Sequence, residues 1–412
     1  MPDSLREHAV LALSARLSQG FSLVGHAYMH FLVALYLTIV LALEREWGLP
    51  YADLIGLWTL GAFLVGVAAP LAGFLGDRWS APGMMVVFFL GAGAATVACG
   101  LADSPTTLMA GLAALGLFAA IYHPVGMAWL VRNAINRGMA LGVFGVFGSA
   151  GVALAGFVAA AFVDFVSWRA AFVVPGAIAL ATGLALLACL VAGLVRDGRI
   201  DRTPHRPASR ADMVRAFFVL SVTVFLGGLV YQATQVAMPK ALALRVPDIA
   251  GSGTLGAGVL FTVIYLVAGA LQLIGGWLAD RYPLKWVYLW TYVFQVPLLF
   301  AAAAWTGIPF VAAAIAMVVL NVGSLPAENC LMARYTPERW RGSAFGAKFV
   351  LSLGVAPVAV QLVAWIQGAT GGFFWLFAVL AAAAAVVVVA IAALPMEEES
   401  AVLASPAPGA AE

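Results

Sequence analysis

The sequence predicts an all-α membrane protein in which twelve transmembrane helices form two parallel six-helix repeats. Hydrophobic residues make up 64% of the 412 residues and charged residues only 10%, whereas a soluble domain has about 25% charged residues. Two short stretches, GFLGDRW beginning at Gly73 and GWLADRY beginning at Gly276, read almost alike. Their glycines lie 203 residues apart, about half of the chain, which indicates an internal duplication.

The spans follow from length, because a membrane-crossing helix needs about 20 mostly apolar residues. The first repeat offers six such runs, at 17–43, 54–76, 83–102, 106–131, 138–163 and 169–195. The second repeat offers six more, at 213–242, 254–279, 285–303, 307–333, 341–366 and 372–394. The run at 17–43 is too long for a signal peptide, so we expect an uncleaved first span.

The charged segments divide the chain into four parts. We expect an N-terminal six-helix half at 1–195, a basic linker at 196–212, a C-terminal six-helix half at 213–395 and an acidic tail at 396–412. With the N-terminus placed in the cytoplasm, sixteen of the 21 Lys and Arg residues fall on the cytoplasmic side, four on the opposite side and Lys348 within a span. This bias predicts a multi-pass protein of the cell (inner) membrane with both termini and the linker in the cytoplasm.

A second pair of matching positions supports the duplication. Arg137-Gly138 begins span five and Arg341-Gly342 begins span eleven, at an offset of 204 residues. The two offsets agree to within one residue, and six spans per half keep both halves in the same orientation. The repeats are therefore expected to be parallel rather than inverted.

Twelve spans, a basic central linker and an Asp-Arg pair after spans two and eight resemble the major facilitator superfamily over roughly residues 15–395. The family's pattern at these pairs is Gly-x-Leu-Ala-Asp-Arg-x-Gly-Arg-Arg/Lys. Its matches here are Gly73, Leu75, Asp77 and Arg78, then Gly276, Leu278, Ala279, Asp280 and Arg281. The resemblance implies the major facilitator fold, and we expect these two segments to gate the protein through Gly73, Asp77, Arg78, Gly276, Asp280 and Arg281.

Both segments depart from the pattern at their ends. Ser80-Ala81-Pro82 replaces the second glycine and the basic pair in the first half. Pro283 replaces that glycine in the second half, where Lys285 keeps one basic residue. Because the basic pair is missing, we do not expect the first half to form the full set of charged contacts that this pattern makes in the family. Tyr122-His123-Pro124 with the glycine-rich span five is similar to the fosmidomycin-resistance-like branch, which implies export of drugs or metabolites coupled to protons.

Ionisable residues inside spans are costly and mark candidate pathways. Glu328 in span ten is the acidic residue that lies away from a span edge, and Lys348 in span eleven is its basic counterpart. Both lie roughly 8–11 Å inside the cytoplasmic boundary at 1.5 Å per residue, so adjacent antiparallel helices could place them side by side. The pair either takes part in proton or substrate coupling or is a static ion pair that joins two helices.

Three histidines form a second group of candidates. His26 and His30 share a face of span one, and His123 lies late in span four. An imidazole can exchange a proton near neutral pH, so these residues could carry protons or bind substrate. The alternative is a neutral histidine that bonds to a backbone carbonyl. Neither an acidic nor a cysteine partner stands at a fixed spacing from them, and the three cysteines are unpaired in spacing, so we expect no metal site.

Neutral polar residues and glycines complete the candidates. Spans one, four, seven and ten line the cavity in the family that the chain resembles, which implies cavity positions for His26, His30, His123, Tyr231, Gln232, Gln235, Asn321 and Glu328. The alternative for the amides is hydrogen bonding between helices. In span five, glycines recur every three residues at Gly142, Gly145, Gly148 and Gly151, a pattern typical of close helix packing.

Together these features predict a secondary active transporter that works by alternating access, most simply a proton-coupled exporter, or antiporter, of a small organic compound or drug. One alternative is uptake or uniport of a small organic anion, with Lys348 contacting the substrate. Another is a sensor or assembly protein that does not transport.

The expected partners follow from this function. The chain has no GxxxxGK[ST] loop, so we do not expect ATP hydrolysis to drive transport directly. It has no HExxH motif, and we do not expect an enzyme. We expect a monomer that binds protons, a small-molecule substrate and the lipid bilayer, without cofactor, metal or nucleic acid.

Overall fold

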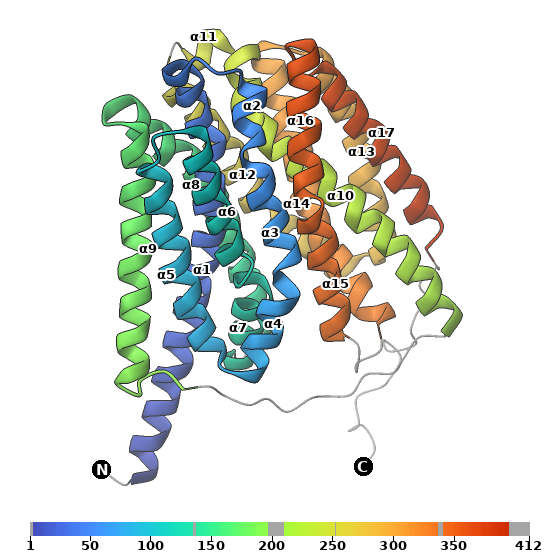
Figure 1. The fold of residues 1–412 in the computed structure, drawn as a ribbon. Helices are drawn as coiled ribbons and strands as arrows, with labels where there is room; N and C mark the ends of the chain where they lie inside the picture. Colours follow the sequence, from blue (N-terminus) through green and yellow to red (C-terminus); the bar gives the residue numbers. More distant parts are fainter. Residues whose placement is uncertain (1–2, 135–136, 197–209, 252, 337–340, 395–412) are drawn as a thin grey trace.

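The computed structural model describes residues 3–134, 137–196, 210–251, 253–336 and 341–394. Every regular element within these ranges is a helix, and they contain no strand (Figure 1). The predicted linker at 196–212 lies outside the described residues except for Arg196 and Arg210–Asp212, and the predicted tail at 396–412 lies wholly outside them.

The first half contains six spans, two of which are divided into shorter helices. Their bounds are α1 Asp3–Trp47, α2 Tyr51–Gly56, α3 Trp58–Val67, α4 Ala69–Arg78, α5 Ala81–Gly100, α6 Pro105–Ala119, η1 Tyr122–Gly126, α7 Met127–Asn133, α8 Arg137–Phe165 and α9 Trp168–Val191. Span two comprises α2, α3 and α4, with a bend of 40° before α4. Span four comprises α6, the π-helical turn η1 and α7.

The second half repeats this plan. Its helices are α10 Arg210–Arg245, α11 Pro247–Ala250, α12 Leu255–Arg281, α13 Leu284–Ala304, α14 Gly307–Tyr335, α15 Arg341–Gly354, α16 Ala356–Thr370 and α17 Phe374–Ala392. Span eleven breaks at Val355, just before Ala356 and Pro357 begin α16, because proline cannot donate the hydrogen bond that a continuous helix needs. The described residues hold eleven candidate spans, or twelve with the bent second span, in agreement with the prediction.

Helix packing repeats from one half to the other. In the first half α5 packs on α9, α3 packs on α6, and α1 packs on α8. Six spans later α13 packs on α17, α12 packs on α14, and α10 packs on α15 and α16. Each helix pair therefore recurs in the same order and direction, as expected for two parallel repeats.

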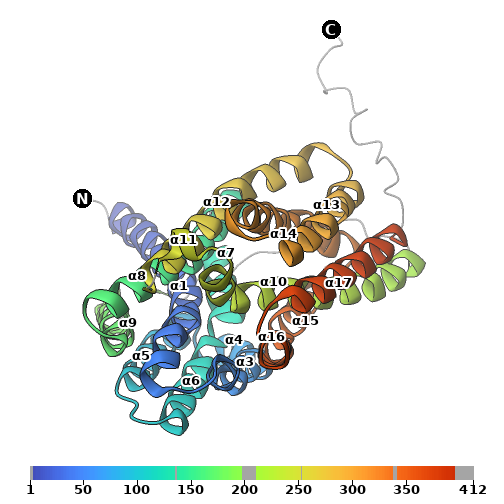
Figure 2. The ribbon, with the colours of Figure 1, turned by 90° about the horizontal axis from the view of Figure 1, so that it is seen from above.

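The two sets of helices meet mainly along spans two, five, eight and eleven, with a smaller contact between α1 and α10. The helix α8 packs on α12. The helix α15 packs on α3 and α4, and α16 packs on α2 and α3. Figure 2 shows the first-half helices on one side of the molecule and the second-half helices on the other, with α10 and α12 next to the first half. The start of α1 and the end of α17 lie at the same end of the bundle (Figure 1), which we call the terminal end. The end formed by α2, α11 and the end of α8 is the far end.

The outer surface is apolar where a soluble protein would carry charge. Leu71, Phe217 and Trp365 lie on three different spans and are 60–71% exposed. Apolar side chains this exposed are expected to face lipid rather than water. Helices can lie in a bilayer because each helix satisfies its own backbone hydrogen bonds.

Candidate functional site

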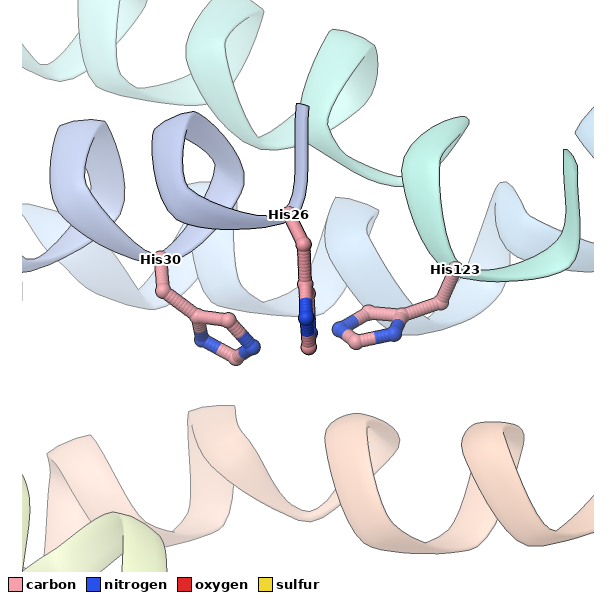
Figure 3. Close-up of side chains that lie close together, drawn as sticks. All are labelled: His26, His30 and His123. Carbon is pink, nitrogen blue, oxygen red and sulfur yellow. The ribbon is translucent and has the colours of Figure 1, made fainter. Parts of the chain in front are cut away.

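The three histidines predicted from separate spans meet in the folded chain. The ring centres of His26 and His30 are 4.9 Å apart, and the ring of His123 is 5.4 Å from that of His26 and 5.3 Å from that of His30. The candidate ligand atoms of the three side chains all lie within 4.8 Å of one another. Figure 3 shows the three side chains pointing into one space, with helices of the second half facing them. We call this group the histidine cluster.

Local structure explains how two spans present the cluster. His26 and His30 are one turn apart on α1, so their side chains project from the same face. His123 lies in η1, where Pro124 has no N–H to donate and the helix widens into a π turn. Such turns often mark functional sites. Within this turn, His123 lies beside the imidazole rings of His26 and His30 on α1.

Aromatic side chains hold the cluster in place. The His26 ring stacks on Phe144 of α8 at 3.6 Å between ring centres and on Tyr122 at 5.3 Å. Tyr122 is fixed in turn, because its hydroxyl donates to the Ser22 carbonyl at 2.7 Å. Gly148 of α8 leaves the room that the His26 ring occupies, since a Cβ there would lie 2.8 Å from both ring nitrogens.

The hydrogen bonds of the cluster are incomplete. The Nδ1 atom of His26 lies 2.7 Å from the Phe144 carbonyl oxygen, which can only accept, so Nδ1 carries the proton and Nε2 keeps a free lone pair. His123 is 6% exposed, and neither of its ring nitrogens has a hydrogen-bond partner among the described residues. A buried group without a partner costs about 1–3 kcal/mol, which calls for an explanation at His123.

The predicted pair of Glu328 and Lys348 is an ion pair. Their Oε1 and Nζ atoms are 2.6 Å apart between α14 and α15, and the residues are 4% and 6% exposed. The hydroxyl of Tyr288 donates to the other carboxylate oxygen of Glu328 at 2.7 Å, and Lys348 also donates to the Asn329 side chain at 2.5 Å. The juxtaposition expected from their depth is therefore confirmed.

Phe349 connects the ion pair to the histidine cluster. Its ring stacks on His123 at 4.9 Å between ring centres, and it follows Lys348 directly on α15. A second-half helix thus touches both groups, at a place where the halves meet. Any movement of α15 relative to α14 would move Phe349 against the cluster.

The remaining predicted polar residues do not join these two groups by hydrogen bonds. Gln235 of α10 is buried, whereas Tyr231 and Gln232 are half-buried. Asn321 of α14 is 6% exposed, and its Nδ2 has no partner among the described residues. A role for these four side chains in binding stays a prediction.

The two Asp-Arg pairs end helices rather than form loops. Asp77 and Arg78 are the last residues of α4, and Asp280 and Arg281 are the last residues of α12. All four side chains are exposed at the terminal end, and the arginines lie over Phe74 at 5.1 Å and over Trp277 at 4.4 Å. Neither aspartate makes an ion pair or a backbone hydrogen bond to another described residue. Their gating role, and that of Gly73 and Gly276, stays a prediction.

Comparison with known proteins decides the family. The family model of the Major Facilitator Superfamily matches residues 21–251, more than half of the chain. The chain belongs to the Major Facilitator Superfamily. This superfamily consists of multi-pass membrane transporters and not of enzymes, in agreement with the fold and with the resemblance seen in the sequence.

Two curated relatives of this superfamily member match it over only part of its length. The chain is 30% identical over 166 residues to a puromycin resistance protein of Streptomyces alboniger, covering 39% of this chain and 32% of that protein. It is 31% identical over 157 residues to an uncharacterised MFS-type transporter of Mycobacterium tuberculosis, covering 36% of this chain and 25% of that protein. The match thus spans a quarter to a third of the length of these curated relatives. The fosmidomycin-resistance-like branch is not addressed by them and stays a prediction.

A solved structure supports the superfamily fold over nearly the whole chain. A bacterial homologue of the human lysosomal transporter Spinster, in an inward-facing and unoccupied conformation, aligns with a TM-score of 0.63. The alignment covers 92% of this chain and 95% of that chain at 14% identity. At this identity the likeness shows the shared fold alone.

In this superfamily member, sequence reasoning missed the contacts that join the halves at the far end. Lys240 of α10 pairs with Glu44 of α1 at 2.5 Å. Asp164 of α8 accepts hydrogen bonds from the backbone of Thr254 at 3.0–3.1 Å and of Leu255 at 2.8 Å, where α12 begins. No local sequence pattern predicts these contacts, because the partners in each pair are 90 or more residues apart in the sequence.

A hollow of about 620 Å³ also lies at the far end. Its lining includes Arg45, Glu46, Asp164 and Arg169. It contains none of the predicted site residues, and its charged lining differs from the aromatic surroundings of the histidine cluster. The hollow therefore does not mark the candidate site.

Proposed function

We propose that this chain is a secondary active transporter that exports a small organic compound in exchange for protons. The observation that carries the proposal is the buried ion pair of Glu328 and Lys348, because an ionisable pair inside a span is costly and usually serves transport. Membership of the superfamily supports transport, and the pair supplies a residue that can bind the coupling proton.

Glu328 is the proposed proton carrier. The groups that face it are Lys348 from α15 and Tyr288 from α13, with Tyr292 packed on Tyr288. Protonation removes the charge that attracts Lys348, while the neutral carboxyl group can keep its hydrogen bond to Tyr288. The helix α15 is then less tightly held to α14.

Release of α15 would reach the interface between the halves. This helix also packs on α3, α4 and α10, so its position influences how the halves close. In alternating access, the two expected halves, 1–195 and 213–395, would move relative to each other as units. The gating segments, with Gly73, Asp77 and Arg78 in α4 and Gly276, Asp280 and Arg281 in α12, would then open and close the terminal end.

The proposed substrate contacts lie on both halves. His26, His30 and His123 would bind from the first half, and Tyr231, Gln232, Gln235 and Asn321 from the second. Phe144, Phe349 and Tyr122 line the histidines with aromatic surface. Apolar walls with a few polar groups fit an amphipathic organic molecule.

The proposed setting is the inner membrane, with a monomer and both termini in the cytoplasm. The Lys and Arg bias supports this orientation. Uptake or uniport of an organic anion through Lys348 is less well supported, because Glu328 and Asn329 already bind its ammonium group. No feature of the described residues favours a sensor or assembly protein.

The test is substrate-driven proton movement in proteoliposomes with an imposed proton gradient. Puromycin is the first compound to try, because one relative is named a puromycin resistance protein, and a thermal-shift screen would find others. Glu328→Gln keeps the shape and the bond to Tyr288 but cannot ionise, so we expect substrate-driven proton flux to fall at least about tenfold, a change of about 1.4 kcal/mol in barrier.

The matched control is Glu46→Gln, which removes an exposed carboxylate at the far end. It should transport like the unmodified protein. Full proton-coupled transport by Glu328→Gln would overturn the proposed coupling site.

A further inference from the structure

The histidine cluster has the dimensions of a metal site. Three imidazoles that bind one tetrahedral zinc ion at 2.0–2.1 Å would place their ring centres about 5.2 Å apart. The observed separations are 4.9, 5.4 and 5.3 Å. The ligand atoms, now within 4.8 Å of one another, would approach to about 3.4 Å for that geometry.

The protonation pattern of His26 suits a ligand. Its Nδ1–H donates to the Phe144 carbonyl, which leaves the Nε2 lone pair available. A metal-binding histidine almost always donates its other N–H to a carbonyl or carboxylate in this way, because the bond fixes the tautomer and the ring orientation. Contacts of the ring with Phe144 and with Tyr122 restrain it further.

His123 supplies an independent observation. It is 94% buried, it points into the cluster (Figure 3), and neither ring nitrogen has a hydrogen-bond partner among the described residues. A bound cation would satisfy one of these nitrogens. The rigid π turn at Pro124 and the ring of Phe349 keep His123 in this position.

We propose that His26, His30 and His123 form a binding site for a transition-metal dication of the Zn²⁺ class. Three neutral imidazoles favour such ions over Mg²⁺ or Ca²⁺, which prefer oxygen ligands. Three protein ligands leave a fourth position open. Because no carboxylate belongs to the group, that position would take an anionic ligand, which lowers the charge held in the membrane.

The site adds a metal ion, with its fourth ligand, to the proposed substrates. In this respect the inference rests on the proposed transport function, since the ion would lie where Phe349 of the second half meets the histidines of the first. Metal binding itself does not depend on proton coupling.

The test measures metal binding to the full-length protein in detergent micelles after removal of metals with a chelator. We expect calorimetry to give one saturable site for Zn²⁺ per chain and no competition from Mg²⁺. Co²⁺ should develop the visible d–d absorption of a tetrahedral site. Loss of one imidazole ligand should weaken binding at least as much as loss of an outer-shell partner, about 10- to 100-fold.

The variants are His26→Gln, His30→Gln and His123→Gln, with His8→Gln, near the start of α1, as the control. His30 is only half-buried, so His30→Gln is the variant that best preserves the fold, and a melting curve checks each protein. Glu328→Gln should bind Zn²⁺ like the unmodified protein even where it no longer couples protons. The inference fails if no saturable Zn²⁺ or Co²⁺ binding occurs, or if binding survives replacement of all three histidines.

Discussion

Replacing Lys348 alone leaves the Glu328 carboxylate buried without its cation. Breaking a buried pair by removing one partner usually costs about 3–5 kcal/mol, so Lys348→Met should lower the free energy of unfolding by roughly that amount. The double variant Glu328→Gln with Lys348→Met removes both charges and should recover most of the loss. Melting temperatures in detergent compare the stability of the unmodified protein, Lys348→Met and the double variant.

The same pair of variants separates a static ion pair from a functional one. A stable double variant that no longer couples protons would assign the pair to transport. A double variant as unstable as Lys348→Met would contradict the charge argument, because it would show that packing, rather than the unpaired carboxylate, causes the loss.

The residue scale also shows what sequence can predict about a site. Glu328 and Lys348 were predictable because charged residues are rare in spans and helix rise sets their depth. The contact of His123 with His26 and His30 was not. It depends on the π turn at Pro124 and on the packing of η1 against α1, and neither follows from the spacing of residues on one helix.

At the scale of elements, the glycine repeat of α8 is less uniform than its spacing suggests. A Cβ at Gly148 would lie 2.8 Å from the His26 ring nitrogens, and one at Gly151 would overlap the Ala27 backbone. A Cβ at Gly145 would make an ordinary contact with Gln272, and one at Gly142 would meet nothing within 4 Å. Only part of the repeat therefore serves close packing against α1.

Gly148→Ala should therefore destabilise the protein, whereas Gly142→Ala should not. Overpacking of a filled site costs about 1–3 kcal/mol, while alanine is favoured over glycine in a helix by up to about 1 kcal/mol. Thermal melting in detergent compares the two variants. Gly148→Ala should also weaken Zn²⁺ binding, since it displaces the His26 ring. Equal melting temperatures for the two variants would contradict the placement of His26 against α8.

At the scale of the whole molecule, the apolar runs and the duplication predicted the number of spans and their parallel order. The helices extend beyond the predicted spans: α1 begins at Asp3, whereas the span was expected from residue 17, and α10 begins at Arg210, although its apolar span begins at Met213 as expected. Polar residues such as Arg210 can continue a helix beyond the bilayer, where water replaces lipid, so hydropathy finds the membrane boundary and not the end of the helix.

The far-end contacts combine a helix cap with a link between halves. Thr254 gives α12 no side-chain cap of its own, and Asp164 of the first half accepts the backbone N–H groups at this helix start instead. A carboxylate at a helix N-terminus is favourable because it meets unpaired donors and the positive end of the helix dipole. The cap can form only while the halves are together at this end.

Asp164→Ala should therefore favour conformations that are open at the far end. Loss of such a cap costs about 0.5–2 kcal/mol, which corresponds to a shift of about 2- to 30-fold in the population ratio. Hydrogen exchange should accelerate by a similar factor at Thr254 and Leu255, and also around Lys240, because its pairing with Glu44 joins the same halves. The control, Ser167→Ala, removes a cap at the same end within one half, where Ser167 accepts from the Ala170 backbone at 3.1 Å. Faster exchange confined to the start of α12 in Asp164→Ala would mean that Asp164 caps this helix without holding the halves together.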